Sequence, residues 1–126
     1  MEKNVRFYHC PICKTTIGLI HGDMEHMTCC GKKLEELVPN TVDASIEKHT
    51  PVYEKVDNKI LVKVGEVEHP MDEDHYIMWV AQVTDNTTTR VRLLPGEKIE
   101  IEFPYIPGAL LYAYCNKHGL WETIVE

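Results

Sequence analysis

Hydrophobic and polar residues alternate with a period of two along most of the chain after about residue 50. The clearest alternation runs from Lys98 to Phe103, where Ile99, Ile101 and Phe103 would face inward. This period is typical of half-buried β-strands. Residues 77–83 are almost all apolar and predict a largely buried strand. We expect strands at 52–56, 59–64, 77–83, 90–94, 98–103, 109–114 and 120–125.

Turn-forming residues separate these predicted strands. Asp57-Asn58 joins the first two as a two-residue hairpin turn, and Pro95-Gly96 and Pro107-Gly108 end two later ones. Short strands divided by turns in this way are typical of an antiparallel β-sandwich. Helical character is weak and confined to 42–48.

The first 37 residues differ from the rest of the chain. They contain four of the five cysteines and one hairpin-like stretch, Thr15 to Leu19. So short a segment cannot bury enough apolar surface to offset its chain entropy, and it needs a metal or a partner subunit. We therefore predict a mainly β protein with a metal-binding domain at 1–37 and a sandwich domain at 38–126.

Composition and charge exclude several classes of function. The 126 residues include 13 basic and 20 acidic side chains, and the net charge of −7 disfavours nucleic acid as a partner. An anionic substrate would need a local positive patch. Neither a signal-peptide core nor a membrane-spanning apolar run is present, so we expect a cytoplasmic protein without membrane attachment. In that reducing compartment the odd number of cysteines favours metal ligation over disulfides.

Four cysteines form the first candidate metal site. Cys10 and Cys13 make a Cys-x-x-Cys knuckle, and Cys29 and Cys30 are adjacent. Four thiolates bind zinc or iron in a tetrahedral arrangement, which adjacent ligands would distort. The alternatives are a purely structural zinc and a strained disulfide between Cys29 and Cys30.

A second candidate site combines the remaining cysteine with histidines. Cys115 and His118 form a Cys-x-x-His pair, and His49, His69 and His75 lie in loops. Singly, each histidine is more simply a solvated loop residue. Together, one thiolate and several imidazoles suit iron or copper. Four imidazoles and one thiolate would leave a sixth position open, as a catalytic metal requires.

These motifs resemble desulfoferrodoxin, the two-iron class of superoxide reductase. The resemblance spans nearly the whole chain, with the motifs in order. One departure is Lys14, where the family usually has glycine, and its side chain is expected to disturb the amide-to-sulfur hydrogen bonds. The matching motifs are Cys10-x-x-Cys13, Cys29-Cys30-Gly31, Asn40-Thr41-Val42-Asp43-Ala44, Glu47-Lys48-His49, His69-Pro70-Met71, His75-Tyr76 and Tyr114-Cys115-Asn116-x-His118-Gly119-Leu120-Trp121.

The resemblance implies two irons per chain in two kinds of domain. The first would lie in a desulforedoxin-like domain and the second, catalytic, iron in an immunoglobulin-like, neelaredoxin-like sandwich. The implied ligands of the first iron are Cys10, Cys13, Cys29 and Cys30. The implied ligands of the second are His49, His69, His75, His118 and Cys115.

The implied activity is superoxide detoxification, by one-electron reduction of superoxide to hydrogen peroxide. In the family pattern Lys48 attracts the anion and Glu47 can occupy the sixth position on ferric iron. The resemblance also implies a rubredoxin-like electron-donor protein, and therefore a part in electron transport. It implies a homodimer as well. Two rival interpretations are a zinc module in which both sites are structural and an electron carrier that uses only the four-cysteine iron.

Overall fold

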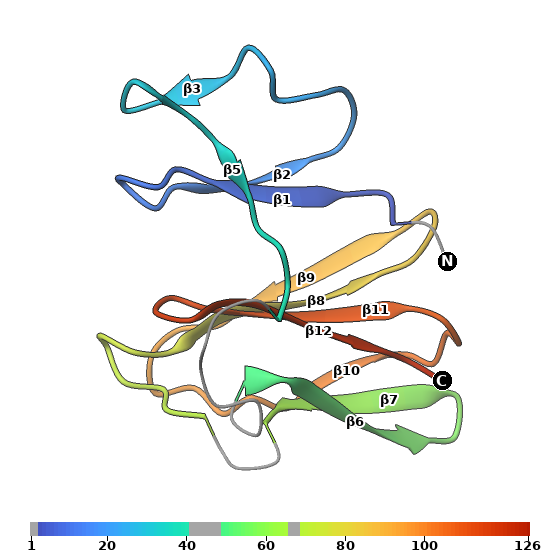
Figure 1. The fold of residues 1–126 in the computed structure, drawn as a ribbon. Helices are drawn as coiled ribbons and strands as arrows, with labels where there is room; N and C mark the ends of the chain where they lie inside the picture. The colour runs from blue at the N-terminus through green and yellow to red at the C-terminus, as the bar shows by residue number, and fades with distance from the viewer. Residues whose placement is uncertain (1–2, 41–48, 66–68) are drawn as a thin grey trace.

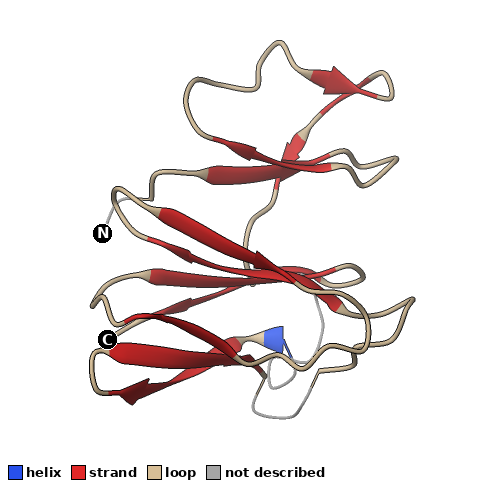
Figure 2. Cartoon of the chain, turned by 180° about the vertical axis from the view of Figure 1, so that it is seen from behind, coloured by secondary structure: helices blue, strands red, loops and turns tan. Residues whose placement is uncertain are grey.

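The computed structural model describes residues 3–40, 49–65 and 69–126 (Figure 1). Regular structure in these ranges is almost entirely β, with a short helical piece at His49 (Figure 2). The helix-like stretch expected at 42–48 lies outside the described residues. The strands are β1 (Arg6–His9), β2 (Thr16–Leu19), β3 (Thr28–Cys29), β4 (Lys32–Lys33), β5 (Glu35–Glu36), β6 (Pro51–Val56), β7 (Lys59–Val64), β8 (Ile77–Val83), β9 (Thr88–Arg92), β10 (Ile101–Pro104), β11 (Leu110–Cys115) and β12 (Gly119–Ile124).

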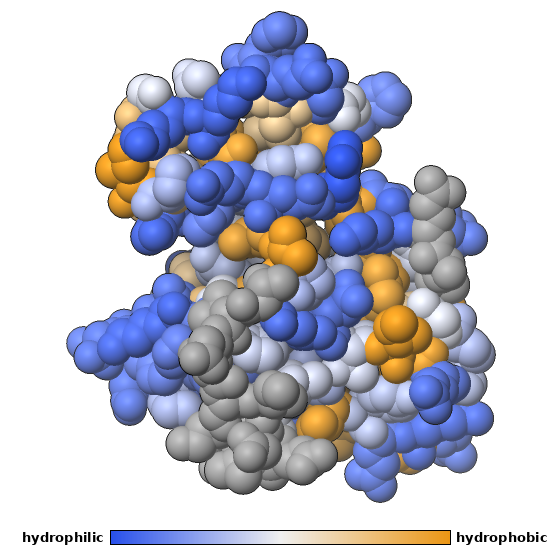
Figure 3. Space-filling model, viewed as in Figure 1, coloured by the Kyte–Doolittle hydropathy of each residue, from blue (hydrophilic) through white to orange (hydrophobic). Residues whose placement is uncertain are grey.

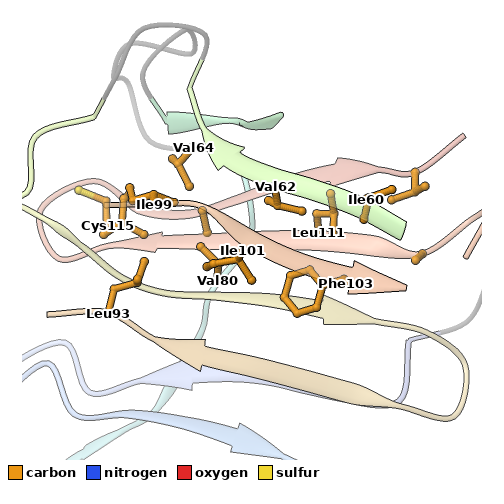
Figure 4. Packing of buried hydrophobic residues seen from close by; sticks show 14 residues of the cluster. Ile60, Val62, Val64, Val80, Leu93, Ile99, Ile101, Phe103, Leu111 and Cys115 are labelled. Atoms are coloured by element: carbon orange, nitrogen blue, oxygen red, sulfur yellow. The ribbon is translucent and has the colours of Figure 1, made fainter. Parts of the chain in front are cut away.

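Seven of these strands form the predicted antiparallel sandwich. One sheet has the order β10-β7-β6 and the other β12-β11-β8-β9. Alternate side chains of both sheets meet in an apolar core, which includes Ile60, Val62, Val80 and Leu111 (Figure 4). Cys115 lies at one end of this core, fully buried.

The period of two located β7, and the apolar run located β8, at their observed bounds, but the period misplaced the start of β10. The strand begins at Ile101, three residues later than expected, although Ile99 is buried as predicted. Residues 98–100 have no partner strand, because the ladder between β10 and β7 starts where Ile101 pairs with Val62. Alternation thus reports which side chains are buried, and burial can continue where strand pairing has stopped.

The N-terminal segment forms a second, smaller β unit above the sandwich (Figure 1). Its main sheet has the order β2-β1-β5, and β3 pairs with β4. Phe7 packs on the sandwich, with its ring centroid 4.9 Å from that of Trp79 and 5.5 Å from that of Tyr112. The outer face of the four-stranded sheet therefore supplies the apolar contact surface that this short segment cannot build alone.

The strand pairings bring several chain segments to one end of the sandwich. Pro51, at the start of β6, pairs with Val64, at the end of β7. Cys115, at the end of β11, pairs with Ile77, at the start of β8. The segments that carry the predicted histidines extend from these four positions. In the described part of the chain, no helix has the length and apolar character needed to cross a membrane.

Candidate metal centres

Three separate stretches of chain meet at this end of the sandwich. Candidate ligand atoms of His49, His69, His75 and Cys115 all lie within 4.8 Å of one another. His49 comes just before β6, His69 and His75 lie between β7 and β8, and Cys115 ends β11. His49, His69 and Cys115 are buried, and His75 is half-buried. The structure thus brings together four of the five residues expected at the second site.

His118, the fifth residue, lies against the same group. Its Nδ1 atom is 2.9 Å from Nε2 of His49 and 3.9 Å from Sγ of Cys115. Two nitrogens that bind one ion at right angles, each at about 2.1 Å, lie about 3.0 Å apart. The spacing of His49 and His118 therefore fits two neighbouring ligands of a common metal.

His69 and His75 each have a ring nitrogen, Nε2, that is available to bind a metal. Nδ1 of His69 lies 2.7 Å from the carbonyl oxygen of Pro70, which fixes a proton on Nδ1 and leaves Nε2 unprotonated. The Nε2 atoms of His69 and His75 are buried and have no hydrogen-bond partner among the described residues. Buried polar atoms without partners are rare, and a metal ion at this position would satisfy both.

The environment keeps these imidazoles neutral, as metal ligation requires. Burial lowers the pKa of His69 to about 4, although the hydrogen bond to Pro70 acts in the opposite direction. Burial also lowers the pKa of His75, and the neighbouring His118 adds to the effect. Burial raises the pKa of the Cys115 thiol, whereas the backbone amides of Lys117 and His118 favour the thiolate.

Two residues that the sequence analysis did not single out hold the site together. Asn116 accepts a hydrogen bond from the amide of Tyr76 at 2.9 Å and donates one to the carbonyl of Asp74 at 3.0 Å. Trp121 stacks on His49, with ring centroids 5.0 Å apart, and donates from Nε1 to the carbonyl of His118 at 3.1 Å. Both belong to the motif that begins at Tyr114. The motif therefore indicated that these residues matter, but it did not predict which groups they contact.

The four N-terminal cysteines form a second group with metal-binding geometry. Their sulfurs lie within 4.8 Å of one another, and all four are free thiols. Sγ of Cys29 is 3.5 Å from that of Cys13 and 4.0 Å from that of Cys30. Four sulfurs at about 2.3 Å from one tetrahedral ion would lie about 3.8 Å apart. The cluster fits a metal, and the disulfide between Cys29 and Cys30 does not form.

Hydrogen bonds favour the thiolate at one end of this cluster. Contact with the Thr15 hydroxyl, at 3.1 Å, lowers the pKa of Cys13 to about 6. The pKa of Cys29 rises to about 12, because its sulfur lies beside those of Cys13 and Cys10. A group of thiolates this close is stable only with a cation among them.

Lys14 leaves the amide-to-sulfur contacts of Cys10 in place. The amides of Ile12 and Cys13 lie 3.4 and 3.5 Å from Sγ of Cys10. The amide of Lys14 donates instead to the Cys10 carbonyl at 3.0 Å, and its ammonium donates to the Pro11 carbonyl at 3.1 Å. Glu47 and Lys48, the two expected catalytic residues, lie outside the described residues.

Comparison with known proteins identifies the family. The family described as Desulfoferrodoxin matches residues 41–124. The desulfoferrodoxin of Syntrophotalea carbinolica is 44% identical over 124 residues, which cover 98% of each chain. The chain belongs to the desulfoferrodoxin family. The desulfoferrodoxin homolog of Archaeoglobus fulgidus is 37% identical and covers 98% of this chain and 99% of its own. The four-cysteine group and the group around Cys115 match the two iron centres of a desulfoferrodoxin.

Solved structures resemble this desulfoferrodoxin in fold. The superoxide reductase from Treponema pallidum aligns with a TM-score of 0.71 and 29% identity, over 94% of this chain and 98% of that one. The one-iron superoxide reductase from Giardia intestinalis aligns with a TM-score of 0.54 and 28% identity, over 64% of this chain and 98% of that one. The near-complete overlap with the first structure includes the N-terminal unit, so the two-part architecture is shared.

Proposed function

We propose that this desulfoferrodoxin is a superoxide reductase, which converts superoxide, one electron and two protons into hydrogen peroxide without forming oxygen. The observation that carries the proposal is the convergence of four imidazoles and one buried thiolate at one end of the sandwich. The overall likeness to the superoxide reductase from Treponema pallidum supports it. The mixed nitrogen and sulfur ligand set also suits iron better than magnesium or calcium.

The proposed ligands of the catalytic iron come from both sheets of the sandwich. Iron held by these groups supplies the one-electron chemistry. Cys115 would supply a thiolate beside the core when the metal is bound; burial raises the pKa of its thiol, and the amides of Lys117 and His118 act in the opposite direction. Trp121 holds the plane of the His49 ring by stacking and fixes the backbone of His118 by a hydrogen bond, so part of the site is arranged before substrate arrives. The ligand set is His49, His69, His75, His118 and Cys115.

Two residues of the segment before His49 complete the proposal. Lys48 is proposed to attract superoxide, because the chain has a net charge of −7 and attraction of an anion must be local. Glu47 is proposed as the carboxylate that takes the remaining position on oxidised iron. Both roles rest on the Glu47-Lys48-His49 motif of the family.

The four-cysteine cluster is proposed as the site of the first iron. It belongs to a domain at 1–37, and the catalytic site belongs to the sandwich domain at 38–126, which the change of sheet after β5 supports. Five free thiols support a cytoplasmic protein. A rubredoxin-like electron donor and a homodimer remain part of the proposal, by resemblance to the family.

The reaction of the iron-loaded protein with superoxide tests this function. The protein is reconstituted with iron, reduced chemically and mixed with superoxide from pulse radiolysis. We expect rapid consumption of superoxide together with oxidation of the iron in the second site. Protein loaded with zinc is the matched control, because we expect it to keep the fold and zinc cannot donate an electron to superoxide. If the two proteins consumed superoxide at the same rate, the proposed function would be wrong.

A further inference from the structure

The ladder between β8 and β11 is irregular where it reaches the second candidate metal site. Tyr114 pairs with Trp79 and Cys115 pairs with Ile77, so Met78 has no opposite residue in β11. A bulge of this kind turns side chains toward a new direction and is common beside functional sites. Strand β11 ends at Cys115, and β8 begins at Ile77. The segments beyond these two residues therefore need other contacts to stay together.

Asn116 supplies these contacts through both its backbone and its side chain. Its amide nitrogen donates to the carbonyl of Tyr76 at 3.2 Å. Its Oδ1 atom accepts from the amide of Tyr76 at 2.9 Å, and its Nδ2 atom donates to the carbonyl of Asp74 at 3.0 Å. A backbone amide can only donate and a carbonyl can only accept, so these partners fix the orientation of the side-chain amide. The side chain thus acts as one additional peptide group at the end of the ladder.

These hydrogen bonds hold the backbone on both sides of His75. Asp74 and Tyr76 are its immediate neighbours in the chain. A tight turn holds it as well, because the amide of Asp72 donates to the carbonyl of His75 at 3.0 Å and the amide of His75 donates to the carbonyl of Asp72 at 3.2 Å. Asn116 therefore ties the whole turn to the end of β11.

The turn before His75 is polar and exposed. It projects from one end of the sandwich, between β7 and β8, and its surface is hydrophilic (Figure 1, Figure 3). Asp72, Glu73 and Asp74 are all exposed. Burial of apolar side chains therefore does not fix the position of this turn, and hydrogen bonds must do so.

Two other histidines of the site have supports of their own. Nδ1 of His69 lies 2.7 Å from the carbonyl oxygen of Pro70, and the ring of His49 stacks on Trp121. His75 is half-buried, and its Nε2 atom has no hydrogen-bond partner among the described residues. The direction of its ring therefore depends on how precisely its backbone is held.

We propose that Asn116 is a positioning residue of the second metal site, which holds His75 in place to bind the same ion as Cys115. Candidate ligand atoms of His75 and Cys115 lie within 4.8 Å of each other, and Asn116 links their two segments by three hydrogen bonds. Asn116 is not itself a ligand and acts through His75. Ligands that are already held in place bind a metal more tightly than ligands that must first be ordered. The inference rests on the proposed iron site, because it concerns how strongly that site holds its ion.

Removal of the Asn116 side chain tests this role in the full-length protein. We expect Asn116→Ala to lower the affinity of the second site for ferrous iron by roughly 10- to 100-fold, measured by anaerobic competition with a chelator. After oxidation, the thiolate-to-iron absorbance should also shift, because it depends on how the ligands surround the iron. Asn86→Ala is the matched control, because Asn86 accepts a hydrogen bond from Thr84 in the turn after β8, at the end of that strand far from the site. It should leave both the affinity and the absorbance unchanged.

A double-mutant cycle with His75→Ala separates positioning from general stabilisation. Because Asn116 acts through His75, adding Asn116→Ala to His75→Ala should lower the iron affinity by less than about twofold further. Losses that multiply independently would overturn the proposal. If His75→Ala binds too little iron for the competition, the absorbance of oxidised Asn116→Ala decides. An unshifted band there would make Asn116 merely structural, even if the free energy of unfolding fell, and would overturn the proposal. These measurements use no superoxide, so normal iron binding without reductase activity would refute the proposed function alone.

Discussion

Nε2 of His49 lies 2.9 Å from Nδ1 of His118, although 69 positions of sequence separate the two residues. Trp121 contacts both, by stacking on the His49 ring and by donating from its indole nitrogen to the His118 carbonyl. One buried side chain thus contacts two proposed ligands that come from segments far apart in the sequence. Groups that orient metal ligands are often as important as the ligands themselves.

Replacing Trp121 should therefore weaken iron binding at the second site. We expect Trp121→Leu to lower the iron affinity of this site by roughly 10- to 100-fold, because both the stacking on His49 and the hydrogen bond to His118 are lost. Trp121→Phe retains a stacking ring and should show an intermediate affinity. Competition with a chelator measures the affinity. An unchanged affinity in Trp121→Leu would show that Trp121 only fills space.

Cys115→Ser should be far more damaging than its small change in volume suggests. It replaces a soft thiolate with a poor ligand at a fully buried position. We expect loss of second-site iron or of superoxide reduction, with the strands still formed by circular dichroism. Cys13→Ser is the matched control, and it should lose the four-thiolate absorbance while its reduced second site still reacts with superoxide. The role of the thiolate would be refuted by normal superoxide reduction in an iron-loaded Cys115→Ser protein.

Lys14 adopts a left-handed backbone conformation, with φ of 65°. Glycine occupies this region without the steric cost of a Cβ atom. We expect Lys14→Gly to stabilise the iron-loaded protein by about 1 kcal/mol. Lys14→Ala removes the same charge but keeps the Cβ atom, so it should give no such gain. Chemical denaturation measures the free energy of unfolding, and equal midpoints for the two variants would contradict this explanation.

Lys48 should control how fast superoxide reaches the reduced site. We expect Lys48→Ala to slow the second-order reaction by roughly tenfold, because one local positive charge is lost. Lys48→Arg should keep most of the rate, since attraction depends on charge more than on shape. Lys59→Ala is the control, because Lys59 lies at the opposite end of β7 from the site. Pulse radiolysis across a salt series should show a steeper decline for the parent than for Lys48→Ala. Identical rates and salt slopes would make Lys48 an ordinary surface lysine.

The sequence predicted the sandwich well, because burial on one face of a sheet imposes a period of two on residues such as those of β7. It did not predict β1 or β5, because Phe7 and Tyr8 are consecutive buried residues that break the alternation in β1, and β5 has only two residues, both exposed. It named the residues that the structure brings together at both candidate sites, because short motifs carry them. The contacts of Asn116 with the segment before β8 and of Trp121 with His49 result from long-range packing, which no local pattern records.

The yield of hydrogen peroxide tests the central claim most directly. Chemically reduced, iron-loaded protein is mixed with less superoxide than there are second-site irons, and peroxide and oxygen are measured together. A reductase forms one hydrogen peroxide for every superoxide consumed and releases no oxygen, because the electron comes from the protein. That is the result we predict. Half as much peroxide, with release of oxygen, would mean that superoxide reacts with itself, and it would contradict the account.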